Sequence, residues 1–315
     1  MLTGPVPNGA RSVSWPWYHH EIGSELTEEA REVLEKYAKV PSGQVESHIY
    51  RIRDKAWGIF PWPCVGEFWF LSFGLSKHPL YTSVVLPRLK SGATLLDLGS
   101  CLGQDLRKCA YDGAPASNLY ASDLFTEYED LSYDFWQDRD RFPKGHYMAE
   151  DILAENHLFS AGNLMMTLGP GQTDIISITM FLHLFDYANQ LKVATRILRL
   201  LSHKPGSLIL GSQAGVAEAK EQPLKPPFDK TKEGGKRTVF RHSPSSFTNL
   251  WQDAGVAAGV PLKVSAVFQA PEKGLPSVQV DSGVSGLSDL LPTKKKQVHL
   301  AELDNRRLYF SIIRS

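Results

Sequence analysis

From Ala93 onward, short apolar runs alternate with amphipathic stretches, and this alternation limits the possible folds more than any other feature of the chain. Apolar runs of strand length separated by helical stretches are typical of β-α-β units, which build a parallel sheet with helices on both faces. The chain is therefore predicted to be an α/β protein. We expect the parallel strands at residues 94–98, 119–122, 146–149, 174–179 and 207–210, and the clearest helix at residues 187–201.

The end of the chain departs from this alternation. Two further apolar runs, residues 263–269 and 308–313, are separated by an insertion rich in Ser, Gly, Pro and Lys instead of a helix, so we expect them to pair antiparallel at the sheet edge. Two segments, residues 215–236 and 271–299, have the composition of solvated, mobile insertions. The sheet domain is thus predicted to span residues 91–315, with insertions near 215–240 and 271–300.

Residues 1–90 are predicted to form a helical cap that carries many aromatic side chains. Thr27 can cap a helix whose first turn is acidic, and a second helical pattern runs from Val45 until Pro61 stops it. Residues 68–73 are unusually apolar, and two interpretations stay open: a helix packed in the core, or a wall of an apolar substrate pocket. The cap is expected to contribute to that pocket.

The charge balance argues against a nucleic-acid partner. Lys plus Arg number 34 and Asp plus Glu number 34, so there is no net field to gather a polyanion, and a small substrate is expected. The three cysteines lack metal-ligand spacing and are too few for a disulfide scaffold. No signal-peptide pattern and no apolar run of roughly 20 residues is present. We therefore expect a cytoplasmic protein with no metal site and no membrane span.

The strongest local signal is an apolar strand that leads into a glycine-marked turn and then a helix. Residues 95–105 read LLDLGSCLGQD. Gly99 and Gly103 let the backbone approach a ligand closely, and amides at the helix start offer hydrogen-bond donors. Such a turn lies at the carboxyl end of the first parallel strand, where open α/β sheets bind ligands, so we expect a nucleotide-like ligand there. Gln104 begins the helix and either caps it or contacts the ligand.

Acidic residues at three successive strand ends narrow the class of ligand. Asp97 lies at the end of the first strand, Asp123 ends the next about 20 residues after the glycines, and Asp151 follows the third. A dinucleotide fingerprint would place a glycine at Cys101, and a carboxylate at Asp97 would repel a pyrophosphate. The same carboxylate suits a ligand with a sulfonium and an amino group. Asp151 can accept a hydrogen bond from an adenine amino group while Ile152 packs on the ring.

At these positions the chain resembles class I S-adenosylmethionine-dependent methyltransferases, a Rossmann-like fold whose seven-stranded sheet ends in an antiparallel hairpin. In that family the first motif binds the methionine part, a second acid holds the ribose and a third lies beside adenine. Cys101 stands where the family has a glycine, so the geometry of the turn stays open. The resemblance implies S-adenosyl-L-methionine as the cofactor, bound by Asp97, Gly99, Gly103, Gln104, Asp123, Leu124, Asp151 and Ile152.

Three segments narrow the resemblance further. Residues 48–57, 60–64 and 240–244 are similar to those of fungal secondary-metabolite methyltransferases, including enzymes that methylate a carboxyl group on farnesylated polyketide acids in meroterpenoid pathways. The similarity implies O-methylation of a lipophilic acid or phenol, with Trp62 as a substrate-contacting residue. It does not identify the acceptor, and a homodimer stays open.

His183 follows the fourth strand and is the candidate general base. A carboxylate acceptor is already anionic at neutral pH and needs no base, whereas a phenol, with a pKa near 10, benefits from one. A structural role for His183 is the alternative. For Arg53, binding of a substrate carboxylate competes with simple exposure to water. For Arg241 and His242, a lid over the acceptor competes with an ordinary turn before a helix that Ser243 caps.

Two rival functions use the same sequence features. One is a protein that keeps the methyltransferase fold but acts as a cyclase or a binding protein, and the three intact acids argue against it. The other is a nicotinamide-dependent oxidoreductase, which the missing middle glycine and the carboxylate at Asp97 oppose.

Overall fold

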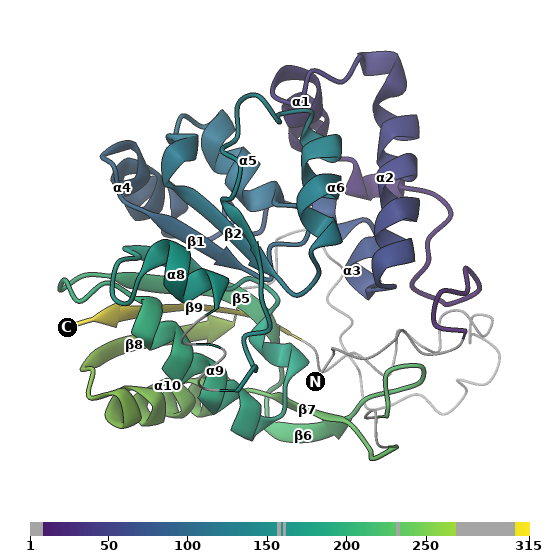
Figure 1. Cartoon of the computed structure of the whole chain (residues 1–315). Coiled ribbons are helices and arrows are strands. Elements are labelled where there is room, and N and C mark those ends of the chain that lie inside the picture. The colour runs from purple at the N-terminus through teal and green to yellow at the C-terminus, as the bar shows by residue number, and fades with distance from the viewer. Residues whose placement is uncertain (1–8, 156–158, 160–161, 231–233, 269–305) are drawn as a thin grey trace, which may run out of the picture.

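A computed structural model describes residues 9–155, 159, 162–230, 234–268 and 306–315. Its centre is a seven-stranded sheet in the order β3-β2-β1-β4-β5-β9-β8 (Figure 1). Strands β1 to β5 are parallel to one another, as the alternating pattern predicts. The strands of this sheet are β1 (Leu95–Leu98), β2 (Leu119–Asp123), β3 (Tyr147–Ala149), β4 (Ile175–Ser177), β5 (Leu208–Gly215), β8 (Leu262–Phe268) and β9 (Arg306–Arg314).

The two last strands pair antiparallel, as expected for the end of the chain. Strand β9 lies between β5 and β8 and is antiparallel to both, and β8 forms the sheet edge. Strand β5 runs five residues beyond its expected end at Leu210, because its later residues pair with β9. The sheet order and the antiparallel end confirm the predicted Rossmann-like α/β fold with its seven-stranded sheet.

Helices cover both faces of the sheet. Because successive side chains along a strand point to opposite faces, neighbouring residues of one strand pack in two different apolar cores. Leu95 joins the core on one face, with α1, α2, α5 and α6, whereas Leu96 joins the core on the other, with α8, α9 and α10. The α-helices are α1 (Glu28–Lys36), α2 (Val45–Ile59), α3 (Pro63–Gly66), α4 (Leu86–Lys90), α5 (Gln104–Tyr111), α6 (Glu127–Trp136), α8 (Asn163–Leu168), α9 (Tyr187–Leu200) and α10 (Pro244–Ala258).

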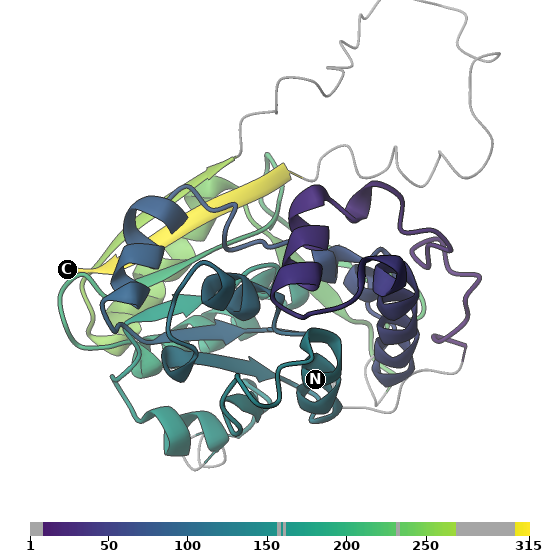
Figure 2. The same cartoon turned by 90° about the horizontal axis from the view of Figure 1, so that it is seen from above.

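The N-terminal helices begin and end where the sequence indicates. The Thr27 side chain accepts a hydrogen bond from the amide of Ala30 and caps α1, and α2 ends at Ile59, just before Pro61. Figure 2 shows these helices, in purple, grouped at one side of the molecule. The apolar residues 68–73 form only a short 3-10 turn, Trp69–Leu71. Phe68, Phe70 and Phe73 are buried in the core, and Trp69 lines a pocket.

A two-stranded ribbon replaces one expected insertion. Residues 215–236 were expected to be solvated and mobile, but β6 (Lys220–Pro223) pairs antiparallel with β7 (Thr238–Arg241). We call β6, β7 and the described residues between them the ribbon. Its Phe228 packs against Phe60 and Trp62, with ring centroids 5.5 and 6.2 Å apart. These aromatic contacts hold the segment on the protein. The other expected insertion, residues 271–299, lies outside the described residues.

Within the described part of the chain, no helix combines the length and hydrophobicity that crossing a membrane requires.

Candidate active site

The glycine turn after β1 contains three residues with left-handed backbone angles. Gly99 and Gly103 have φ values of +75° and +66°, and Cys101 has a φ of +49°. At Gly99 an added Cβ would lie 2.7 Å from the Phe181 ring, so a side chain does not fit there. Cys101 adopts the conformation that a glycine would take more easily, at a cost of about 1–2 kcal/mol. The sequence departs from the family pattern at this position, but the turn keeps the expected conformation.

Neighbouring strands hold the strained turn in place. The Cys101 amide donates to Asp123 Oδ2 at 2.8 Å, and the Tyr147 hydroxyl donates to the Cys101 carbonyl at 2.6 Å. Trp136 Nε1 donates to the carbonyl of Leu102 at 2.7 Å. Side chains from β2, β3 and α6 therefore fix the backbone that faces the ligand.

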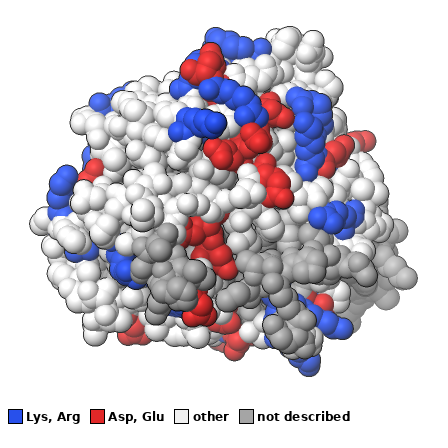
Figure 3. Space-filling model, in the orientation of Figure 1, with Lys and Arg blue, Asp and Glu red and all other residues white. Residues whose placement is uncertain are grey.

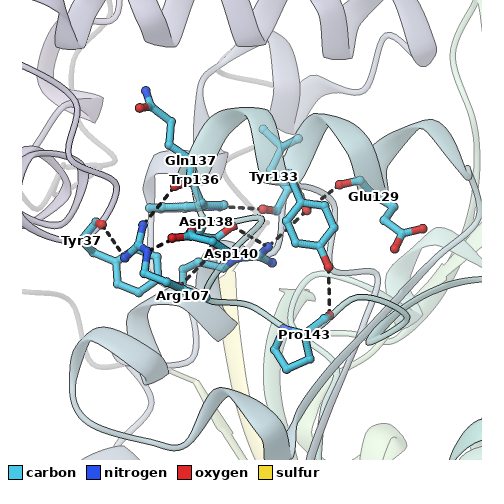
Figure 4. Close-up of polar contacts among 12 residues, drawn as sticks. Tyr37, Arg107, Glu129, Tyr133, Trp136, Gln137, Asp138, Asp140 and Pro143 are labelled. Atoms are coloured by element: carbon cyan, nitrogen blue, oxygen red, sulfur yellow. Dashed lines mark hydrogen bonds and ion pairs between the residues drawn. The ribbon is translucent and has the colours of Figure 1, made fainter.

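A buried ion pair lies behind the same turn (Figure 4). Arg107 of α5 donates from Nε to Asp138 Oδ2 at 3.0 Å, and its guanidinium stacks 3.8 Å from the Phe142 ring centroid. The Tyr37 hydroxyl, from the end of α1, donates to the same Asp138 oxygen at 2.8 Å. Arg107 Nη1 approaches Gly103 so closely that a Cβ there would clash. The Arg107–Asp138 ion pair therefore holds a side chain packed against Gly103, the second glycine of the turn.

Carboxylates stand at the ends of the first two strands: Asp97 is buried, and Asp123 is partly buried. Asp97 accepts a hydrogen bond from the Ser100 hydroxyl at 2.8 Å, and burial raises its pKa to about 6. Asp123 accepts from the amides of Cys101 and Leu124, and burial raises its pKa as well. Buried carboxylates are costly without a positive partner, so this end of the site suits a cationic ligand.

A pocket of about 290 Å³ opens at the carboxyl ends of β1 to β4. Its walls are mostly apolar, and they come from segments far apart in sequence: α3, the strand ends, the turn after β4 and the ribbon. Its lining includes eight predicted site residues: Trp62, Gly99, Asp123, Leu124, Asp151, Ile152, His183 and Arg241.

His183 lies in the 3-10 turn Leu182–Leu184 that follows β4. Burial, with Arg241 and Arg307 nearby, lowers the pKa of His183 well below its usual value, so the imidazole is neutral at physiological pH. Its Nδ1 atom is buried and has no hydrogen-bond partner among the described residues. Arg241 donates to the His183 carbonyl at 2.8 Å and so fixes the turn.

Comparisons with known proteins found several methyltransferases that are similar to this chain. Residues 17–71 match the family described as meroterpenoid methyltransferase N-terminal domain. The structure of Haemonchus contortus phosphoethanolamine N-methyltransferase 2 with S-adenosyl-L-methionine is 16% identical, with a TM-score of 0.46, and the match covers 91% of this chain and 60% of that one. O-methyltransferase atr3 of Stereocaulon alpinum is 38% identical over 251 residues, 80% of this chain and 68% of the relative. Asnovolin E/Chermesin D methyltransferase nvfJ of Aspergillus novofumigatus is 37% identical over 261 residues, 83% of this chain and 86% of the relative. The chain belongs to the family of these fungal methyltransferases.

The site of this methyltransferase fits S-adenosylmethionine, the cofactor that the sequence resemblance implies. Gly99 lines the pocket with backbone atoms alone, and the carboxylates of Asp97 and Asp123 favour a ligand with positive charge and hydroxyl donors. Asp151 and Ile152 line the same pocket beyond β3. Which part of the ligand each of these residues binds stays a prediction from the sequence.

Other predicted residues of the methyltransferase lie outside the pocket lining. Asp97 is buried within β1, Gly103 ends the turn as the N-cap of α5, and Gln104 is the first residue of that helix. Arg53 is buried and stacks on the Tyr18 ring, 4.1 Å from its centroid, so it neither faces water nor reaches the pocket.

His242 also turns away from the pocket. Its Nε2 lies 3.0 Å from Gln190 Oε1 and its Nδ1 lies 2.9 Å from Ser246 Oγ, at the start of α10. Burial lowers its pKa to about 4, so it is a neutral structural residue. Ser243 caps α10, as the turn interpretation of this segment expects.

The sequence patterns do not indicate several residues that line the pocket of the methyltransferase. The ribbon contributes Leu224, Phe228 and Arg237, although its composition indicated a solvated loop. The apolar Phe228 within that polar segment was the available signal. Two thiols, Cys64 and Cys101, also line the pocket, and burial raises the pKa of Cys64 to about 12 and that of Cys101 well above its usual value.

Proposed function

We propose that this enzyme methylates a carboxylate oxygen of a lipophilic acid in fungal secondary metabolism. The name of one relative, O-methyltransferase atr3, supports O-methylation. Three sequence segments also resemble enzymes that methylate a carboxyl group on farnesylated polyketide acids. The apolar lining of the pocket supports a lipophilic acceptor. A protein that keeps the fold without methyl transfer is disfavoured, because Asp97, Asp123 and Asp151 are all present and the relatives are named as methyltransferases.

The lowered pKa of His183 is the observation that favours a carboxylate over a phenol as the acceptor. This imidazole is the candidate base at the pocket wall, and its lowered pKa makes it a weak acceptor for the proton of a phenol. A carboxylate is already ionised and needs no base. The neutral His183 then shapes the wall and orients the acceptor.

Bound S-adenosylmethionine would supply a methyl group on a sulfonium, for transfer to the acceptor oxygen with the carbon–sulfur electron pair left on sulfur. The chain's own residues bind and orient both reactants and exclude water. Asp123 and Asp151 hold the adenosine part, and the aromatic side chains of Trp62, Phe181 and Phe228 cover the pocket.

An acceptor with both candidate groups tests this proposal. We expect 4-octyl-2-hydroxybenzoate, incubated with isotopically labelled cofactor, to give the methyl ester and not the methyl ether, as read by mass spectrometry. His183→Gln should keep at least about a tenth of the turnover, because no base is required. Formation of the ether, or complete loss of turnover in His183→Gln with normal S-adenosylhomocysteine binding, would contradict the carboxylate assignment. No product of either kind would contradict the proposed acceptor class.

Other expectations from the sequence stay predictions: a cap of residues 1–90, a cytoplasmic location, a homodimer and the absence of a nucleic-acid partner. The three cysteines are free thiols, which supports a reducing compartment. On the face drawn in Figure 3, basic and acidic side chains are interspersed on a mostly uncharged surface, which is a poor match for a polyanion.

A further inference from the structure

Arg237 is a cationic side chain in the wall of a mostly apolar pocket. It directly precedes β7 and lines the pocket together with Phe228 and Val239 of the same ribbon. Its Nη1 donates to the Phe228 carbonyl at 3.2 Å, and its amide donates to the Asp229 carbonyl at 2.8 Å. The side chain is therefore fixed at the pocket wall by the backbone of the ribbon.

No carboxylate within the described ranges forms an ion pair with Arg237. Burial of the guanidinium lowers the pKa of Arg237. By contrast, the guanidinium of the buried Arg107 forms an ion pair with the carboxylate of Asp138. A partly buried guanidinium without a counter-ion is costly, and an anion that enters the pocket removes that cost.

The charges of the pocket are separated between its two sides. The acids Asp123, Glu150 and Asp151 lie at the ends of β2 and β3, whereas Arg237 and Arg241 come from the β7 side. A cationic cofactor is favoured at the first side and an anion at the second. The two reactants of the proposed reaction carry charges of these signs.

We propose that Arg237 binds the carboxylate of the acceptor and makes the ribbon the element that selects acids over neutral lipophilic molecules. This inference rests on the proposed function. A guanidinium fork matches a carboxylate with two parallel hydrogen bonds. Methylation turns the carboxylate into a neutral ester, which loses the ion pair, so the same side chain favours release of the product.

Binding of two matched probes tests the role of Arg237. The probes are 4-octylbenzoate and its uncharged amide, 4-octylbenzamide, titrated calorimetrically into the protein saturated with S-adenosylhomocysteine. We expect the wild type to bind the benzoate about 10- to 100-fold more tightly than the amide. Arg237→Gln should remove this preference and leave the amide affinity within about twofold. Lys236→Gln, which removes an exposed charge from the adjacent position, should behave as the wild type.

A purely structural role for Arg237, as a brace for the Phe228 carbonyl, predicts a different result. Arg237→Gln would then weaken both probes equally, and that outcome overturns the inference, as does a wild type that does not distinguish the probes. If Arg237→Gln does not fold, Arg237→Lys replaces it: the retained charge should give an intermediate preference, and no preference overturns the inference.

Ester formation from 4-octylbenzoate, measured in parallel, separates this inference from the proposed function. A wild type that prefers the benzoate but forms no ester contradicts the function and leaves the anion site intact. Ester formation with an unchanged preference in Arg237→Gln contradicts the anion site and leaves the function intact.

Discussion

Asp97 is a carboxylate buried at the end of β1, next to a second buried acid, Asp105. Burial raises the pKa of Asp97 to about 6, although hydrogen bonds from Ser100 and Ser177 oppose this shift. Above this pH the side chain is charged and attracts the amino group of the cofactor. Below it the side chain takes up a proton, and the attraction is lost.

Cofactor affinity should therefore depend on pH. We expect the dissociation constant of S-adenosylhomocysteine, measured by calorimetry, to rise about tenfold as the pH falls from 7 to 5. Asp97→Asn should bind more weakly at pH 7 and show no such dependence. Asp151→Asn should bind more weakly but keep the dependence. A dependence that persists in Asp97→Asn would assign the titration to another group.

At the residue scale, spacing places acidic residues at the strand ends, but it does not distinguish side chains that line the pocket from those buried elsewhere. Arg241 and His242 were grouped because they are adjacent in sequence. In a strand, however, neighbouring side chains point to opposite faces. Arg241 therefore lines the pocket while His242 faces Gln190 of α9. Arg53 shares a helix face with the buried Ile49 and Trp57, four residues away on either side, and is buried with them.

At the scale of elements, the contact of α1, α5 and the end of α6 depends on the buried charges of Arg107 and Asp138. Both side chains are almost fully inaccessible, and Tyr37 adds a hydrogen bond from α1 (Figure 4). Removal of one partner leaves an uncompensated buried charge, which destabilises far more than loss of a surface pair.

We expect Arg107→Met to lower the free energy of unfolding by about 3–5 kcal/mol, and Tyr37→Phe to lower it by about 1 kcal/mol. The control is Arg139→Met, which breaks the exposed pairs with Asp130 and Asp134 and should change it by less than about 0.5 kcal/mol. Urea denaturation measures all three. If Arg107→Met and Arg139→Met lower the free energy of unfolding by equal amounts, the buried ion pair has no special role in stability.

The strands of the sheet could be predicted because each is a short apolar run that the core on one or both faces requires. The ribbon could not be predicted from the sequence in this way. Its residues 220–241 are rich in proline and lysine, and what orders them is the stacking of Phe228 on Phe60 and Trp62, which are more than 150 residues earlier in the chain. A local pattern carries no information on such a contact.

For the whole molecule, one apolar core joins the N-terminal helices to the sheet. Trp57 and Phe73 belong to the same core as Leu95 and Leu106. Polar contacts also cross the expected domain boundary at residue 91: the Leu75 amide donates to Asp105 at 2.9 Å, and the His78 ring lies 3.0 Å from the Phe310 carbonyl.

A chain that begins at residue 91 should therefore not fold by itself. Without the N-terminal helices, one face of the sheet would expose its apolar side chains to water. We expect such a chain to bind the dye ANS and to lack the cooperative thermal transition of the full chain, as followed by calorimetry and circular dichroism. Cooperative melting with retained S-adenosylhomocysteine binding would instead establish residues 91–315 as an independent domain.

We expect the partial burial of the two pocket thiols, Cys64 and Cys101, to limit their alkylation by the methyl donor. A sulfonium methyl donor alkylates any strong nucleophile within reach, and thiolates are among the strongest that proteins contain. Because burial raises the pKa values of Cys64 and Cys101, both remain protonated at neutral pH. These sulfur atoms therefore do not compete with the acceptor, and self-inactivation by S-methylation is suppressed without excluding cysteine from the pocket wall.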